Sequence, residues 1–197
     1  MPGRKPYEAA HNFIASMQKA ASCVTASVLR PSKNGYEVSK EPHLLTFADD
    51  PVELAGRQDF ALSVRHEYRI MRGEGLWGRW KVRTAGYYYE LQDDSDDEVI
   101  SYHWHPESRS PLAFPHMHIG VGSGVTVAGL REPHYETPRM ALESFLLMLI
   151  KDFGVQPKRD DWGNVLRRGH AQYEQERTWQ YHPTEREAQP GDKPSSW

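Results

Sequence analysis

Apolar and polar residues alternate strictly in two histidine-rich runs, residues 100–105 and 116–121. A β-strand sends successive side chains to opposite faces, so this pattern restricts both runs to extended strands with one apolar face. We expect the apolar residues, Tyr102 and Trp104 among them, to face the core. If the two runs pair as a hairpin, four imidazoles gather on the other face of the sheet: His103, His105, His116 and His118.

The same alternation predicts two longer strands upstream. Apolar residues occupy every second position through most of Phe60–Ile70, and the pattern resumes from Trp80 to Tyr89. Glycines between residues 73 and 78 indicate the turn, and Gly86 marks a β-bulge in the second strand. Charged residues lie opposite the apolar ones: Arg65, Glu67, Arg69, Lys81 and Arg83. We therefore expect cations and imidazoles on one face of an antiparallel sheet.

Helical spacing of apolar residues predicts an amphipathic helix between Tyr7 and Ala21 and a second one ending before Gly154. For the second helix, Thr137 is a suitable cap and Pro138 a suitable first residue. Its apolar stripe includes Phe145 and Leu149 and predicts a helix packed on the apolar face of the sheet. A last helix is expected to carry Trp162–Tyr173.

These elements predict an α+β fold: an N-terminal helix, an antiparallel sheet of about five or six strands, and two C-terminal helices. A further strand is expected at Val24–Leu29, with a turn at Asn34–Gly35. The segment from Tyr36 to Gly56 has no clear assignment. We expect one domain over residues 1–181 and a disordered tail over 182–197, because the tail is polar and rich in Pro, Gly and Ser.

The composition excludes several classes of protein. The formal net charge of −3 does not indicate a nucleic-acid or membrane binder by bulk charge. The single cysteine, Cys23, excludes an internal disulfide and a cysteine-based zinc site. The longest apolar stretch, Phe145–Ile150, is far too short to span a membrane. We expect a cytoplasmic protein without a membrane partner.

Histidines beside cations favour acid–base chemistry on RNA. Imidazole titrates near neutral pH, so a pair can act as general base and general acid. In this hypothesis His116 and His118 are catalytic, and His103 and His105 orient the substrate. Three cations would contact phosphate: Arg83, Lys81 and Arg65. The leading prediction is therefore an RNA-binding protein or a metal-independent ribonuclease.

Two alternatives remain open. The same four histidines, His103, His105, His116 and His118, can hold zinc or another divalent transition metal, as in a metal-dependent hydrolase or oxygenase. Glu67 is the nearest carboxylate by face. For the acid–base role, His134 is a weaker candidate because it lies outside the predicted sheet. The third alternative is a non-enzymatic interaction protein whose aromatic-rich sheet or glycine loop meets a partner.

Two polar loops carry weaker signals. The acidic run Asp93–Glu98 lacks the glycine and distant glutamate of an EF-hand loop, so we expect a solvated hairpin loop. Gly120–Gly124 lacks the Gly-Lys-Ser/Thr ending of a phosphate-binding loop, so we expect a turn.

The stretch from about Val64 to Gly120 resembles the TumE-type toxins of bacterial toxin–antitoxin pairs. The resemblance rests on an aromatic strand with Tyr102 and His103, followed by Phe114-Pro115-His116, His118 and Gly120. The second histidine comes one residue earlier than in that pattern, and less than a third of the chain is covered. The resemblance implies a toxin-like, RNA-directed activity and a cognate antitoxin as partner.

Overall fold

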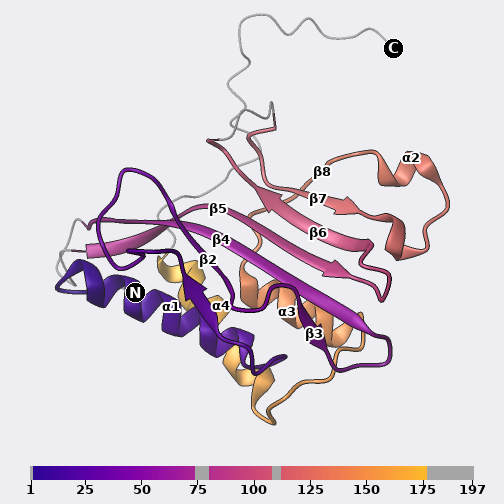
Figure 1. The fold of residues 1–197 in the computed structure, drawn as a ribbon, viewed down its shortest axis with the longest axis horizontal. Coiled ribbons are helices and arrows are strands. Elements are labelled where there is room, and N and C mark those ends of the chain that lie inside the picture. Colours follow the sequence, from indigo (N-terminus) through magenta and orange to yellow (C-terminus); the bar gives the residue numbers. More distant parts are fainter. Residues whose placement is uncertain (1, 74–79, 108–111, 177–197) are drawn as a thin grey trace, which may run out of the picture.

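The computed structural model describes residues 2–73, 80–107 and 112–176 as an α+β protein with an eight-stranded antiparallel sheet (Figure 1). The strands are β1 Leu29–Pro31, β2 His43–Phe47, β3 Val52–Leu54, β4 Phe60–Arg72, β5 Trp80–Gln92, β6 Glu98–Trp104, β7 His116–Ile119 and β8 Tyr135–Glu136. Their order is β1-β2-β4-β5-β6-β7-β8, with β3 paired to β4. The α+β prediction is confirmed, whereas the prediction of five or six strands is too low.

The additional strands are short and are held by pairing to neighbours. β2 and β3 come from the unassigned segment, and both pair with the long strand β4. β8 has two residues, Tyr135 and Glu136, which pair with β7. The predicted strand at Val24–Leu29 is displaced, because β1 begins only at Leu29. Pairing partners far along the chain set these elements, and local apolar patterns do not reveal them.

β4 and β5 form the long hairpin that the alternation predicts, and the bulge at Gly86 is confirmed. Glu67 pairs with Gly86 and Tyr68 pairs with Thr84, so β5 contains one extra residue at this point. A Cβ on Gly86 would lie 2.8 Å from the Trp104 carbonyl oxygen of β6, which explains the glycine. Residues 74–79 of the predicted turn lie outside the described residues.

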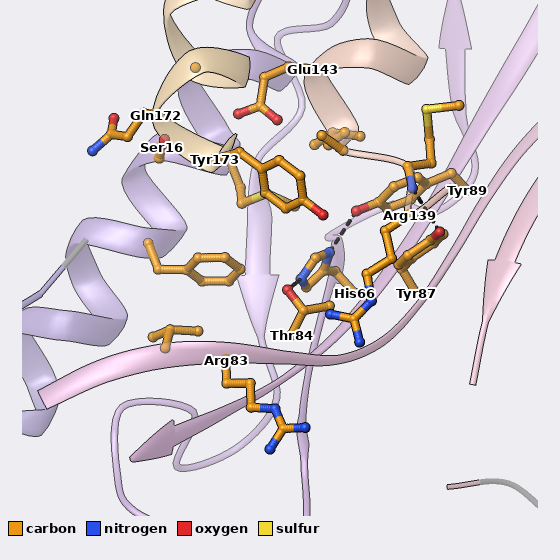
Figure 2. A pocket seen from close by; sticks show the side chains of 17 residues that line it. Ser16, His66, Arg83, Thr84, Tyr87, Tyr89, Arg139, Glu143, Gln172 and Tyr173 are labelled. Atoms are coloured by element: carbon orange, nitrogen blue, oxygen red, sulfur yellow. Dashed lines mark hydrogen bonds between the residues drawn. The ribbon is translucent and has the colours of Figure 1, made fainter. Parts of the chain in front are cut away.

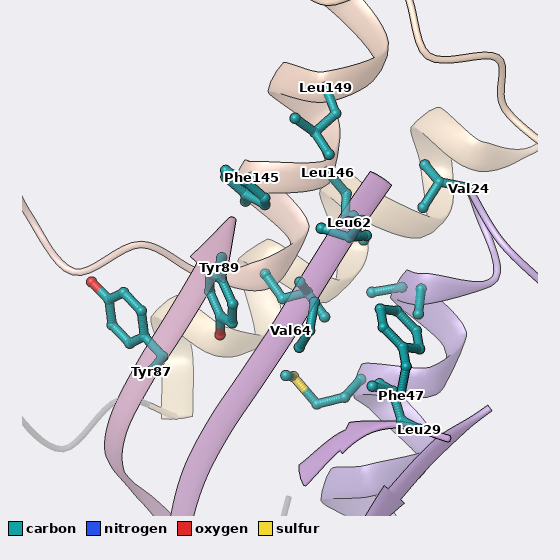
Figure 3. Close-up of a cluster of buried hydrophobic side chains, with 14 of the residues drawn as sticks. Val24, Leu29, Phe47, Leu62, Val64, Tyr87, Tyr89, Phe145, Leu146 and Leu149 are labelled. Atoms are coloured by element: carbon teal, nitrogen blue, oxygen red, sulfur yellow. The ribbon is translucent and has the colours of Figure 1, made fainter. Parts of the chain in front are cut away.

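Three helices pack on one another and line one face of the sheet (Figure 1): α1 Pro6–Ala21, α3 Leu142–Lys151 and α4 Trp162–Glu176. Figure 3 shows their shared core, in which Leu62 and Val64 of β4 and Tyr89 of β5 meet Phe145 and Leu146 of α3. The N-terminal helix and both C-terminal helices are thus confirmed.

The start of α3 is later than predicted. Ala141 is the extended N-cap residue, and Pro138 lies before the helix. The Met140 backbone N–H donates to the Tyr87 hydroxyl of β5 at 2.8 Å, which holds this approach segment extended against the sheet. The predicted stop is confirmed, because Gly154 adopts a left-handed φ of 73° after the helix.

The acidic run is a tight hairpin turn between β5 and β6. The Asp93 carboxylate accepts hydrogen bonds from the Ser95 and Asp97 backbone N–H groups, and Asp96 has a φ of 63°. The glycine run forms the short 3₁₀ helix η1, Val121–Ser123, beside this turn, and the short helix α2, Ala128–Arg131, follows. The acidic run is thus the expected hairpin turn, whereas the glycine run forms a single 3₁₀ turn that is assigned as a short helix.

No helix in the described part of the chain is long and apolar enough to cross a membrane. The predicted tail, residues 182–197, lies outside the described residues, so the proposed domain boundary remains a prediction.

Candidate metal centre

β6 and β7 pair as the predicted hairpin, and their register brings the two His-x-His pairs together. His103 is directly opposite His116, and Ser101 is opposite His118. Directly opposite residues point to the same face of a sheet. Tyr102 and Trp104 point to the helix-covered face of the sheet, which confirms that the aromatic residues of β6 face the core. The histidines of β6 and β7 point to the opposite face, as predicted.

Four imidazoles of this outer face form a compact cluster. The ring centroid of His103 lies 4.6 Å from that of His118 and 5.4 Å from that of His116. His116 and His118 are 5.1 Å apart. His105 lies at the margin, 5.4 Å from His116 and 6.2 Å from His103. The structure therefore brings all four predicted histidines together, with His103, His116 and His118 at the centre.

The ring nitrogens of the central histidines have an unusual environment. The Nε2 atoms of His103 and His118 are buried, and neither has a hydrogen-bond partner among the described residues. His116 is 1% exposed, and its Nδ1 lies 2.9 Å from the Phe114 carbonyl oxygen. That carbonyl can only accept, so Nδ1 carries the proton and Nε2 keeps its lone pair. The geometry thus favours the neutral tautomer that a metal ligand requires.

Burial also favours neutral rings at His103 and His118. Removal from water, together with a smaller effect of neighbouring imidazoles, lowers the pKa of His103 to about 3 and that of His118 to about 4. Burial likewise lowers the pKa of His116. Protonated imidazoles would repel one another in this cluster. At neutral pH the three rings are therefore lone-pair donors without charge.

The three rings fit a single ion. One ring nitrogen from each of His103, His116 and His118 lies within 4.8 Å of the other two. Around tetrahedral zinc such nitrogens are about 3.4 Å apart, so the widest pair would close by at most about 1.4 Å. Binding of one ion would require side-chain rotations that close this gap.

A further imidazole comes from outside the sheet. His134 lies between α2 and β8, and its ring centroid is 4.3 Å from that of His118 and 5.1 Å from that of His116. Its side chain is exposed, unlike the three central rings. β8 then places Glu136 directly opposite His116, on the outer face. One imidazole and one carboxylate therefore border the central histidines on the solvent side.

The predicted phosphate contacts are dispersed. Arg65 shares a row with Tyr88 and His103, so its Cα lies two strands, about 10 Å, from that of His103. Arg83 is five residues from Tyr88 along β5, which is about 17 Å, and Lys81 is two residues further. The structure thus places Lys81 and Arg83 away from the cluster and brings only Arg65 near it.

The positions of three residues were not predicted from the sequence: His134, Glu136 and His66. His134 and Glu136 lack a sheet signal, because β8 has only two residues and no strand pattern. Glu67, the carboxylate chosen by face, lies on β4, whereas Glu136 is on the strand adjacent to β7. His66 falls at an apolar position of the β4 alternation, between Val64 and Tyr68, and that position was sufficient to predict its burial.

Comparisons of the chain with protein-family models, with curated proteins and with solved structures gave no significant match. The likeness to TumE-type toxins therefore remains an untested expectation, and the function has to be argued from the site itself.

Proposed function

We propose that the protein binds one divalent transition-metal ion through His103, His116 and His118. The observation that carries the proposal is the pair of buried Nε2 atoms, on His103 and His118, that have no partner among the described residues. An unpaired buried polar atom costs about 1–3 kcal/mol, and a metal ion bound by both nitrogens would remove that cost. The rigid hairpin β6–β7 supplies all three ligands.

Zinc fits this ligand set well. Three neutral imidazoles suit zinc, and three histidines with one open position form the usual arrangement of a catalytic zinc site. His134, whose ring centroid lies 4.3 Å from that of His118, is the candidate for the fourth position, and Glu136 lies opposite His116 on β8. A bound ion would act as a Lewis acid and lower the pKa of a water ligand. We therefore propose metal-dependent hydrolysis as the class of chemistry.

The same geometry gives less support to metal-independent cleavage of RNA. A general acid must carry a proton, whereas burial lowers the pKa values of His103, His116 and His118. Lys81 and Arg83, the expected phosphate contacts, lie along β5 beyond the end of β6. An RNA substrate and an antitoxin partner, both implied by the toxin resemblance, remain predictions without a supporting contact.

The proposal is tested by calorimetric titration of the untagged, metal-free protein with zinc. We expect one zinc ion per chain. His103→Ala and His118→Ala should each weaken zinc binding by more than about tenfold, or about 1.4 kcal/mol, because each removes one ligand. His11→Ala is the matched control, since His11 is an exposed histidine of α1.

Two outcomes would contradict the assignment. One is a protein that stays folded and takes up no zinc. The other is zinc binding that His11→Ala weakens as much as His118→Ala does, because the ion would then lie outside the hairpin. Circular dichroism of each variant distinguishes a lost ligand from a lost fold.

A further inference from the structure

A cavity lies on the face of the sheet opposite the histidine cluster. It is bounded by α1, by β4 and β5, by the segment before α3, and by the facing ends of α3 and α4 (Figure 2). Its volume is about 120 Å³. Cavities of about 150 Å³ lined by apolar residues bind benzene, so this space fits one small ring.

Much of the wall is aromatic or contains a thioether. α1 contributes Phe13 and Met17, β5 contributes Tyr87 and Tyr89, and the segment before α3 contributes Met140. Flat aromatic faces and polarisable sulfur atoms favour a planar ring over an aliphatic chain. The wall therefore favours an aromatic ligand.

The polar groups on the sheet side of the cavity already have partners. His66 Nδ1 lies 2.7 Å from the Tyr89 hydroxyl, and its Nε2 lies 3.1 Å from the Thr84 hydroxyl (Figure 2). Burial lowers the pKa of His66 to about 3, so this ring has no charge at neutral pH. The Tyr87 hydroxyl accepts the Met140 backbone N–H at 2.8 Å. These groups form a neutral, hydrogen-bonded wall.

The cations of the wall do not favour an anionic ligand. The guanidinium carbon of Arg139 lies 3.4 Å from the centroid of the Trp104 ring, and Arg139, Gln172 and Tyr173 each have an interaction partner. Arg83 borders the cavity, but Figure 2 shows its guanidinium pointing away. Among the residues that the structure describes, the wall thus offers no unpaired cation to a ligand.

One buried acceptor of the wall has no partner on another residue. Glu143, the second residue of α3, is 6% exposed, and among the described residues its carboxylate accepts a hydrogen bond only from its own backbone N–H. Burial raises the pKa of Glu143, because the charged form is removed from water. A buried acceptor in this state gains free energy from a donor that a ligand brings with it.

The Glu143 carboxylate also borders a second hollow, between α1 and α4. The lining of that hollow contains no Phe, Tyr, Trp or Met among the described residues, so it has none of the wall that favours a ring. Figure 2 shows the carboxylate pointing from α3 toward Ser16 and Tyr173, which line the aromatic cavity. A ring with a donor can therefore meet both the wall and the acceptor only in the aromatic cavity.

We propose that this cavity binds a small neutral aromatic molecule with a hydroxyl or amino donor, its ring against the aromatic wall and its donor on the Glu143 carboxylate. A cationic ligand is disfavoured, because Arg139 lines the same cavity. The site is distinct from the proposed metal centre, since Tyr87 and Tyr89 point to the helical face of the sheet and the histidine cluster points to the other.

Phenol and toluene are the probes, and NMR titration of the full chain measures their binding. The two molecules have nearly the same shape, but phenol has a hydroxyl where toluene has a methyl group. We expect the wild type to bind both at millimolar concentration. Glu143→Met should weaken phenol binding by about tenfold without weakening toluene binding, because only phenol loses a hydrogen bond.

Glu143→Gln is the matched control for this substitution. It removes the same charge from the first turn of α3, but its amide oxygen remains an acceptor. Glu143→Gln should therefore bind phenol more tightly than Glu143→Met does, and the two variants should bind toluene alike. A purely structural role of Glu143 in α3 would change the binding of both probes together.

A second pair of variants locates the ligand. Ser16→Phe fills the cavity beside Glu143 and should abolish the binding of both probes. Ala15→Phe adds the same ring at the neighbouring, exposed position of α1, which does not line this cavity, and should bind both probes as the wild type does. Circular dichroism checks that each variant is folded.

Four results would overturn the proposal. They are no phenol binding to the wild type, equal losses of phenol and toluene affinity in Glu143→Met, equal phenol affinity in Glu143→Gln and Glu143→Met, and wild-type phenol binding in folded Ser16→Phe.

Discussion

Four histidines of the sheet differ in the hydrogen-bond partners of their ring nitrogens. His66 has a partner for each ring nitrogen, so it is a structural residue of the core. His116 has one protein partner, through Nδ1. His103 and His118 each have a buried Nε2 without a partner among the described residues. Hydrogen bonding, which varies from ring to ring, therefore distinguishes the structural His66 from the histidines that we propose as metal ligands.

The buried ring of His66 predicts how stability depends on pH. Its pKa is about 3 in the folded protein and about 6.5 in the unfolded chain, so the unfolded chain binds the extra proton between these values. The stabilising contribution of the neutral His66 ring to the unfolding free energy is complete above pH 6.5. It declines as the pH falls toward 3. The largest slope is about 1.4 kcal/mol per pH unit.

Chemical denaturation of His66→Gln measures this contribution. The unfolding free energy of the variant should change less steeply than that of the wild type between pH 6.5 and 5. His11→Gln, at an exposed position of α1, should keep the wild-type slope. Equal slopes in all three proteins would show that His66 is protonated alike in both states.

At the scale of elements, alternation in the sequence predicts the long strands well and the short ones poorly. β4 and β5 have thirteen residues each, enough for the pattern to be seen, and the hairpin of β6 and β7 follows from the histidine parity. β8 has two residues, so nothing in the local pattern places His134 and Glu136 beside the cluster. The start of α3 was predicted too early. The hydrogen bond from the Met140 backbone N–H to the Tyr87 hydroxyl joins residues that are far apart in the sequence, so no local pattern reveals it.

Gly120 lies between β7 and η1, where the chain packs closely against the backbone of β6. A Cβ at this position would lie 1.9 Å from the Glu98 carbonyl oxygen, which is backbone and cannot rotate away. Gly120→Ala should therefore lower the unfolding free energy by about 1–3 kcal/mol, as overpacking does in well-packed sites. Because His118 lies two residues away, zinc affinity should fall as well.

Gly129 is the control for this substitution. A Cβ on Gly129 of α2 meets no atom within 4 Å, so Gly129→Ala should change stability by less than about 0.5 kcal/mol. Denaturant titration of both variants makes the comparison. An equal effect of the two substitutions would show that the contact at Gly120 does not hold β7 in place.

At the scale of the whole molecule, one sheet presents two different chemistries. The helical face holds the hydrophobic core and a cavity lined by residues of α1, β5 and α4. The outer face holds imidazoles that gather where β6, β7 and the segment before β8 meet. Strand parity separates the two faces, so each can be altered without the other.

Elemental analysis of the untagged protein, purified without chelator, is the most direct test of the proposed metal centre. We expect about one equivalent of zinc or another divalent transition metal per chain, and its loss in the double variant His116→Ala/His118→Ala. A folded wild-type protein that contains no such metal, and that takes up none when supplied with a stoichiometric amount of zinc, would contradict it. So would a double variant that retains the metal of the wild type.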